Sequence, residues 1–129
     1  MEKVLVTGGS GYIGLHCISL LLNEGYAVRT SLRSMERKKE ILEALSGLIK
    51  NDESLEFCEL DLMRDEGWDA AVKGCSYVLH VASPVYEKNM QDENSFIQPA
   101  KEGLLRALKP AIKYKIKRFV MTSSIAAIT

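Results

Sequence analysis

The sequence predicts an α/β fold in which a parallel sheet is covered by helices on both faces. Short and almost continuously apolar runs, which are typical of strands buried on both sides, alternate with longer segments of helical periodicity. The first run leads directly into a glycine-rich turn that opens a helix. With right-handed crossovers, this alternation gives a doubly wound sheet with the strand order 3-2-1-4-5.

Five strands are expected, each short and apolar, at residues 3–7, 27–31, 55–59, 77–81 and 119–122. Helices are expected at residues 12–24, 34–50 and 94–113, with a further short helix after Asp65. Gly25 is expected to stop the first helix, and Ser34 and Asp65 are expected to cap the second and third. Pro99 and Pro110 should delay the start of the last helix or kink it.

Size and charge limit the classes of function. The chain has 129 residues, of which 47% are apolar, so it can form one domain with a hydrophobic core. Seventeen basic and seventeen acidic residues cancel, so no overall field favours nucleic acid or an anionic membrane. A basic cluster near the end of the chain is interpreted as a solvated helix end rather than a nucleic-acid surface; it comprises Lys109, Lys113, Lys115, Lys117 and Arg118.

Location and redox chemistry are also constrained. No apolar stretch is long enough to cross a bilayer, and the first strand begins too early for a signal peptide, so a cytoplasmic protein is expected. Cys17, Cys58 and Cys75 are far apart, with no C-x-x-C pair, which argues against a disulfide framework and against a metal site. They are expected to be small buried hydrophobic residues.

The last residues, 125–129, are apolar and follow directly on the fifth strand. An apolar strand edge is usually protected in a folded protein. We therefore expect the chain to be the N-terminal part of a longer domain, or a second copy to cover this edge in a homo-oligomer.

The glycine-rich turn is the strongest functional signal. It fits G-x-G-x-x-G through Gly9, Gly11 and Gly14, and the spaced form T-G-x-x-G-x-x-G from Thr7. A strand that turns through glycines into a helix aims unpaired backbone N–H groups and the positive helix end at an anion, and a pyrophosphate fits there. A purely structural turn is the alternative. The turn residues assigned to a dinucleotide are Thr7, Gly8, Gly11, Tyr12, Ile13 and Gly14.

The end of the second strand distinguishes the two nicotinamide dinucleotides. An acidic residue about twenty positions after the glycines would bind the ribose hydroxyls of NAD, but the chain has Ser31 there, followed two residues later by Arg33. A guanidinium can pair with a 2′-phosphate and stack on adenine, so NADP is favoured over NAD. Arg37, Lys38 and Lys39 are interpreted as a solvated helix face.

Together these motifs resemble the extended short-chain dehydrogenase/reductase family, and most closely its dihydroflavonol reductase and cinnamoyl-CoA reductase branch. The matching segments are residues 6–14, 25–33, 61–62, 74–75, 80–84 and 118–124. The resemblance implies that residues 1–129 form a Rossmann-type NAD(P)-binding domain, with the substrate-binding C-terminal part absent. It also implies hydride transfer between NADP(H) and a small carbonyl compound or alcohol.

The resemblance further assigns residues to the coenzyme. Asp61 would accept a hydrogen bond from the adenine amino group and the Leu62 backbone would help hold the ring, although Asp61 could equally be a turn residue. The segment Val81, Ala82 and Ser83 would contact the coenzyme mostly through its backbone at the end of the fourth strand. His16 and His80 are interpreted as packed or partly exposed residues rather than catalysts.

Ser124 matches the family's catalytic serine, which orients the substrate carbonyl, and Ser123 is its neighbouring candidate. A run of hydroxyl residues that merely ends a strand is the alternative. The family also needs a tyrosine followed four residues later by lysine, but the tyrosines here are followed at that distance by His16, Thr30, Val81, Met90 and Arg118. The chain alone is therefore expected to bind coenzyme but hardly to turn over.

Three function classes remain open: an NADP(H)-dependent oxidoreductase, a non-catalytic NADP-sensing module, and a nucleotide-sugar epimerase or dehydratase. Arg33 and residues 80–84 favour the first over the third. A Tyr-x-x-x-Lys motif beyond Thr129 would distinguish the first from the second.

Overall fold

A computed structural model describes residues 2–8, 11–81 and 94–121, with residues 94–100 described by their backbone alone. It contains one five-stranded parallel sheet in the order β3-β2-β1-β4-β5, which confirms the predicted topology. The strands are β1 (Lys3–Thr7), β2 (Ala27–Leu32), β3 (Leu55–Glu59), β4 (Tyr77–His80) and β5 (Arg118–Met121).

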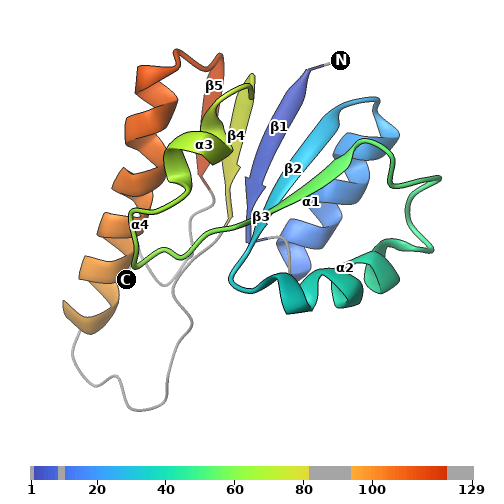
Figure 1. Cartoon of the computed structure of the whole chain (residues 1–129), viewed down its shortest axis with the longest axis horizontal. Helices are drawn as coiled ribbons and strands as arrows, with labels where there is room; N and C mark the ends of the chain where they lie inside the picture. The colour runs from blue at the N-terminus through green and yellow to red at the C-terminus, as the bar shows by residue number, and fades with distance from the viewer. Residues whose placement is uncertain (1, 9–10, 82–93, 122–129) are drawn as a thin grey trace.

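The helices are α1 (Tyr12–Asn23), α2 (Lys38–Leu45), α3 (Trp68–Val72) and α4 (Asn94–Lys113), with a 3₁₀ turn, η1 (Met35–Arg37), before α2. Figure 1 shows α1 and α2 on one side of the sheet and α3 and α4 on the other. This is the Rossmann-type arrangement that the alternating pattern predicts. None of the helices in the described part of the chain is both long and apolar enough to cross a membrane.

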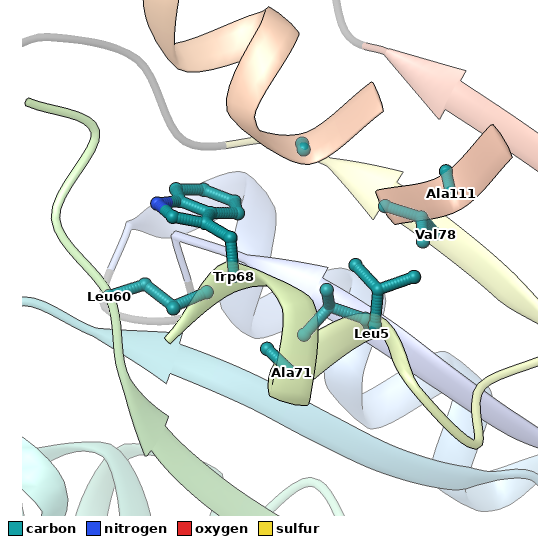
Figure 2. Packing of buried hydrophobic residues seen from close by; sticks show 8 residues of the cluster. Leu5, Leu60, Trp68, Ala71, Val78 and Ala111 are labelled. Carbon is teal, nitrogen blue, oxygen red and sulfur yellow. The ribbon is translucent and has the colours of Figure 1, made fainter. Parts of the chain in front are cut away.

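Alternate residues of β1 supply two separate cores. Leu5 packs with Trp68 of α3 and Ala107 of α4 on one face, and part of this cluster is shown in Figure 2. Val4 and Val6 point to the other face, where they pack with the buried side chains of α1 and α2. Since successive side chains of a strand point to opposite faces, β1 needs an unbroken apolar run to be covered on both.

Helix α1 ends as its sequence predicts. Gly25 adopts φ +95°, its amide donates to the Leu22 carbonyl at 3.2 Å, and the Tyr26 amide donates to the Leu21 carbonyl at 3.0 Å. This pair of bonds is the Schellman motif, in which glycine readily takes the left-handed conformation.

The second helical segment is shorter than predicted. The Ser34 hydroxyl accepts a hydrogen bond from the Glu36 amide, so the predicted cap is present, but it caps η1 rather than an α-helix. Helix α2 then ends at Leu45, not near Lys50. The Leu45 carbonyl accepts from the Leu48 amide at 2.8 Å, and the Leu48 carbonyl accepts from the Asn23 side chain of α1 at 2.9 Å, so a tertiary contact holds a turn where the helix would continue.

The predicted cap at Asp65 is wrong. Helix α3 starts at Trp68, and the residue before it is Gly67 at φ +85°, without a side-chain cap. The Asp65 carboxylate instead accepts a hydrogen bond from Arg106 Nε of α4 at 2.8 Å. The carboxylate that the local pattern assigned to the cap of α3 is therefore paired with a guanidinium of another helix.

Neither proline interrupts α4, which runs without a break from Asn94 to Lys113. A proline lacks the backbone N–H and normally disfavours a helix interior. The helix nevertheless continues past Pro110, whose carbonyl accepts from the Tyr114 amide at 2.9 Å. Pro110 and the neighbouring Ala111 are buried, and Ala111 belongs to the core of that face, so packing outweighs the local cost.

Arg29 links β2 to the end of α3. Its Nη1 donates to the carbonyls of Ala71 at 2.8 Å and Lys73 at 3.0 Å, and its Nε pairs with Glu56 at 2.9 Å. The last carbonyls of a helix lack intrahelical partners and form the negative end of its dipole, so a cation is favoured there. This contact helps to fix α3, which carries Trp68.

The three cysteines are free thiols and are partly buried. Burial raises the pKa of Cys58 to about 11, and burial also raises the pKa of Cys75. Both thiols are therefore protonated near neutral pH. All three cysteines pack against the two cores, as expected of small hydrophobic residues, but they are partly buried rather than buried as predicted.

Candidate functional site

The carboxyl ends of β1, β2 and β4 meet at one edge of the sheet, where α1 begins. Thr7 pairs in register with His80, and Val6 with Thr30, so these strand ends lie side by side. Gly8 follows β1 in the left-handed conformation, with φ +75°, which a residue with a Cβ rarely adopts. The predicted glycine turn is therefore present at the strand order switch, where open α/β sheets bind ligands.

Two amides of this turn are used within the protein. The Gly8 amide donates to Ser31 Oγ at 3.2 Å, and the Gly11 amide donates to the Gly8 carbonyl at 3.1 Å. These two N–H groups are therefore not among the unpaired donors that the motif predicts.

Among residues 2–8, 11–81 and 94–121, backbone donors for which no hydrogen-bond partner is found lie in the first turn of α1. Its first helical bond runs from the Leu15 amide to the Gly11 carbonyl at 2.9 Å, so the amides of residues 12–14 precede it and have no intrahelical acceptor. Tyr12 and Ile13 are exposed, and the first turn has no acidic side chain to compete for the positive helix end. This end of α1 can hold a diphosphate.

Gly11 tests whether the turn fits such a group. Its φ of −81° suits any residue, and a Cβ added there would come no closer than 3.5 Å to the nearest described atom, the Gly8 carbonyl oxygen. The protein's own described atoms thus give no reason for glycine at this exposed position. A ligand that must approach the backbone closely gives one. Gly14 differs, since it is buried within α1.

Thr7 connects two of the strand ends. It is fully buried, its Oγ1 lies 3.0 Å from His80 Nδ1, and the same oxygen accepts a hydrogen bond from the Val81 amide at 2.9 Å. These contacts hold the start of the segment after β4 against the glycine turn. Of the segment predicted to contact the coenzyme, Val81 is described, whereas Ala82 and Ser83 lie outside the described residues.

The two histidines lie where the sequence analysis expects them. His80 is buried, with Phe119 stacked at 6.1 Å and Trp68 edge-on at 6.3 Å between ring centroids. Burial lowers the pKa of His80 to about 4. His16 is exposed and packs edge-on against the Tyr12 ring at 4.5 Å.

The buried His80 predicts a pH dependence of stability. The unfolded chain binds a proton at His80 below pH 6.5, but the folded protein binds it only near pH 4, so stability falls as the pH drops through this window. The free energy of unfolding should decrease by about 1–3 kcal/mol between these limits. Urea unfolding measured across this pH window should show a smaller decrease in the free energy of unfolding for His80→Gln. This variant removes the imidazole but keeps every carboxylate, so the remaining decrease reports the other titratable groups. Equal pH profiles for the two proteins would contradict the prediction.

The end of β2 presents Ser31 and Arg33 differently. Ser31 is buried beneath the glycine turn, whereas Arg33 is exposed one residue beyond the strand, and no hydrogen bond or ion pair to it is found within residues 2–8, 11–81 and 94–121. Arg37 pairs with Glu40 at 3.2 Å, and Lys38 Nζ lies 5.2 Å from the Phe57 ring centroid. Arg33 thus lacks the described pairings that engage Arg37 and Lys38.

Glu59 was not predicted from the sequence to lie near the end of β2. It ends β3 and pairs in register with Leu32, so it lies beside the end of β2, and its carboxylate accepts a hydrogen bond from the Met35 amide at 3.2 Å. Only the parallel register brings residue 59 close to residue 32. The sequence feature that could have identified Glu59 is an acidic residue at the end of the strand expected next to β2.

Asp61 is a turn residue in this structure. Its Oδ1 accepts from the Met63 amide at 2.9 Å, and its carbonyl accepts from Trp68 Nε1 at 3.2 Å. The Leu62 carbonyl accepts from Arg106, and the Leu62 side chain packs against the core of that face. The predicted contacts of Asp61 and Leu62 with adenine stay predictions.

The serines assigned to catalysis and coenzyme binding, Ser123 and Ser124, lie outside the described residues, as do Gly9 and Ser10 of the turn. The role of Ser124 therefore stays a prediction.

A separate cavity of about 320 Å³ lies between α3 and α4. It includes Arg106 and Lys113, which pair with Asp65 at 2.8 Å and Asp69 at 3.0 Å, and none of its lining residues belongs to the glycine turn. Lys117 also pairs with an acid, Glu2. These ion pairs favour the interpretation of the basic cluster as a solvated surface.

Known proteins are similar to this chain in both sequence and fold. The chain is 39% identical over 123 residues to dihydroflavonol 4-reductase of Dianthus caryophyllus, covering 95% of this chain and 34% of that protein. It is 34% identical over 129 residues to an anthocyanidin reductase of Vitis vinifera, covering 99% of this chain and 38% of the relative. The chain thus spans about a third of the length of these relatives.

Solved structures give the same result. The crystal structure of yeast methylglyoxal/isovaleraldehyde reductase in complex with NADPH superposes with a TM-score of 0.81 at 30% identity, covering 98% of this chain and 38% of that one. Vestitone reductase from alfalfa has a TM-score of 0.76 at 32% identity, with 98% and 37% coverage. Since residues 4–128 match the NAD-dependent epimerase/dehydratase family, the chain belongs to that family.

Proposed function

We propose that this chain is the coenzyme-binding part of an NADP(H)-dependent oxidoreductase, which transfers hydride between the coenzyme and a small carbonyl compound or alcohol. The observation that carries the proposal is that Gly8, which leads from β1 toward the amino end of α1, is hydrogen-bonded to Ser31 at the end of β2, and that Arg33 is exposed two residues after Ser31. The similarity to an NADPH-bound reductase and to flavonoid reductases supports it.

Each part of the site has a proposed task. The amides of Tyr12, Ile13 and Gly14 bind the diphosphate, and Arg33 binds the 2′-phosphate. The remaining contacts are assigned through the family resemblance: adenine to Asp61 and Leu62, and the rest of the coenzyme to Thr7, Gly8, Gly11, Val81, Ala82, Ser83 and Ser123. The coenzyme supplies or accepts hydride when bound, and Ser124 orients the carbonyl.

The 129 residues alone are proposed to bind coenzyme with little turnover. Proton transfer by a positioned side chain contributes about 10²- to 10⁴-fold to such reactions, and the chain has no tyrosine with a lysine four residues later. A cytoplasmic location and a homo-oligomeric whole enzyme belong to the same proposal.

A non-catalytic NADP-binding module is the alternative that the sequence leaves open. A longer form of the protein that contains a downstream Tyr-x-x-x-Lys motif and reduces a carbonyl compound would favour the enzyme.

A titration tests the coenzyme assignment. The Kd of the chain for NADPH, followed by its fluorescence, should be at least about tenfold lower than the Kd for NADH, because only NADPH offers Arg33 a second phosphate. As a control, adenosine 2′,5′-bisphosphate should displace NADPH at lower concentrations than 5′-AMP does. Tighter binding of NADH, or binding of neither coenzyme, would contradict the proposal.

A further inference from the structure

We propose that Ser31 is a positioning residue of the coenzyme site: its hydroxyl holds the amide of Gly8 and so sets the shape of the diphosphate-binding turn. This inference rests on the proposed function, because the turn is taken to bind a dinucleotide. It assigns to Ser31 a task that the glycine motif does not contain.

The contact is specific and shielded. Ser31 Oγ accepts the Gly8 N–H at 3.2 Å across 23 residues of sequence, and Ser31 is only 5% exposed. Gly8 is in the left-handed conformation at φ +75°, so the chain changes direction there. A bond to this amide therefore acts on the residue at which the chain leaves β1.

A second hydroxyl on β2 extends the same attachment. Thr30 Oγ1 is buried and donates to the Val6 carbonyl at 2.9 Å. Two consecutive residues of β2 thus hold the last part of β1 and the first residue after it. The end of β2 therefore positions the glycine turn, and it also carries Arg33 as the next residue after the strand.

Ser31 also lies where a carboxylate would favour NAD. A hydroxyl at this place can accept the Gly8 hydrogen bond without adding negative charge next to a 2′-phosphate. The diphosphate that the turn binds is common to NADPH and NADH, whereas Arg33 is assigned to the phosphate that only NADPH has. Loss of the Ser31 contact should therefore raise the Kd for NADPH and the Kd for NADH by the same factor.

The test compares Ser31→Ala with the unaltered chain. Ser31→Ala should raise the Kd for NADPH and for NADH by about three- to tenfold each, with their ratio unchanged, because one hydrogen bond is lost. Hydrogen exchange of the Gly8 amide, followed by NMR without coenzyme, should accelerate by a similar factor. Ser31→Thr, which keeps the hydroxyl, should restore both values.

Ser19→Ala is the matched control. Ser19 is 6% exposed, and its hydroxyl donates to the His16 carbonyl at 3.0 Å within α1. Ser19→Ala therefore removes an equally buried hydroxyl that does not contact the turn. It should change neither Kd nor the exchange of the Gly8 amide. If Ser31→Ala does not fold, Ser31→Cys replaces it, since a thiol is a weak acceptor and should show the same losses.

The outcomes separate this inference from the proposed function. If the unaltered chain binds neither coenzyme, the proposed function fails. If the chain binds NADPH but Ser31→Ala binds it equally well or more tightly, or loses NADPH alone, Ser31 does not position the turn. An unchanged exchange rate of the Gly8 amide would overturn the inference at its structural basis.

Discussion

Replacing Arg33 with alanine is expected to raise the Kd for NADPH about 10- to 100-fold and to leave the Kd for NADH within about twofold. A guanidinium can form two parallel hydrogen bonds with a phosphate, and each bond to a charged group contributes about 1.5–3 kcal/mol. Because Arg33 is exposed, water and salt weaken this contribution. We therefore expect the loss in binding free energy to correspond to one such hydrogen bond rather than two.

The position of Arg33 supports a role of this size. It follows Leu32, which is buried in the core shared by β2, α1 and α2, so its backbone is anchored while its side chain reaches solvent. In the described part of the chain it has no ion pair that a phosphate would have to displace. Glu59 lies beside the same strand end, and Glu59→Gln should strengthen NADPH binding slightly by removing a negative charge.

Two variants make the Arg33 measurement specific. Lys39→Ala removes a nearby exposed cation from α2 and should change neither Kd by more than about twofold. Arg33→Lys should give an intermediate Kd for NADPH, because an ammonium keeps the charge but not the fork of donors. Equal losses for NADPH and NADH in Arg33→Ala would show that Arg33 does not contact the 2′-phosphate.

Replacing Trp68 with alanine should lower the free energy of unfolding by about 3–5 kcal/mol. Trp68 is 3% exposed, and it packs with Leu5, Val78 and Ala107 in the core of one sheet face, part of which is shown in Figure 2. A domain of this size is stable by only about 5–15 kcal/mol, so the cavity left by the indole should cost a large share of its stability. Urea unfolding followed by circular dichroism measures the change.

The indole nitrogen has a separate task. Trp68 Nε1 donates to the carbonyls of Arg64 at 2.9 Å and Asp61 at 3.2 Å, so it holds the turn that carries the predicted adenine contacts. Trp68→Phe keeps an aromatic ring in the core but loses this donor and the second ring of the indole. It should cost about 1–3 kcal/mol, since the Arg64 carbonyl loses the indole donor while the Asp61 carbonyl keeps the Arg64 amide at 3.1 Å, and it should also weaken NADPH binding.

Ile112 provides the control for Trp68. It is 69% exposed on α4, so Ile112→Ala should change the free energy of unfolding by no more than about 0.5 kcal/mol. If Trp68→Ala cost no more than Ile112→Ala, the assignment of Trp68 to the core would be wrong. If Trp68→Phe bound NADPH as tightly as the unaltered chain, the turn at Asp61 would not depend on the indole N–H.

Features that depend on neighbouring residues were predictable from the sequence. The bounds of β3 and α4 match the prediction, because an apolar run and a helical period are both local patterns. The stop of α1 at Gly25 was also predictable, since the left-handed conformation depends on a single glycine. The strand order follows from the alternation of strands and helices, because right-handed crossovers leave few other topologies.

Predictions that failed involve partners far away in the sequence. Helix α2 ends early where Asn23 of α1 binds the Leu48 carbonyl, and Asp65 does not cap α3 because Arg106 of α4 takes its carboxylate. Each local pattern was compatible with the expected structure. The competing side chain could be identified only after the helices had been packed together.

The sequence by itself determined that a glycine turn joins the first strand to a helix and that an arginine, not an acid, follows the second strand. Only the tertiary structure decided which amides of the turn remain available: Ser31 takes that of Gly8 across 23 residues, and Thr7 reaches His80 across 73. The physical reason is the register of the parallel sheet. It brings strand ends together at one edge, and a pattern of neighbouring residues carries no information about that register.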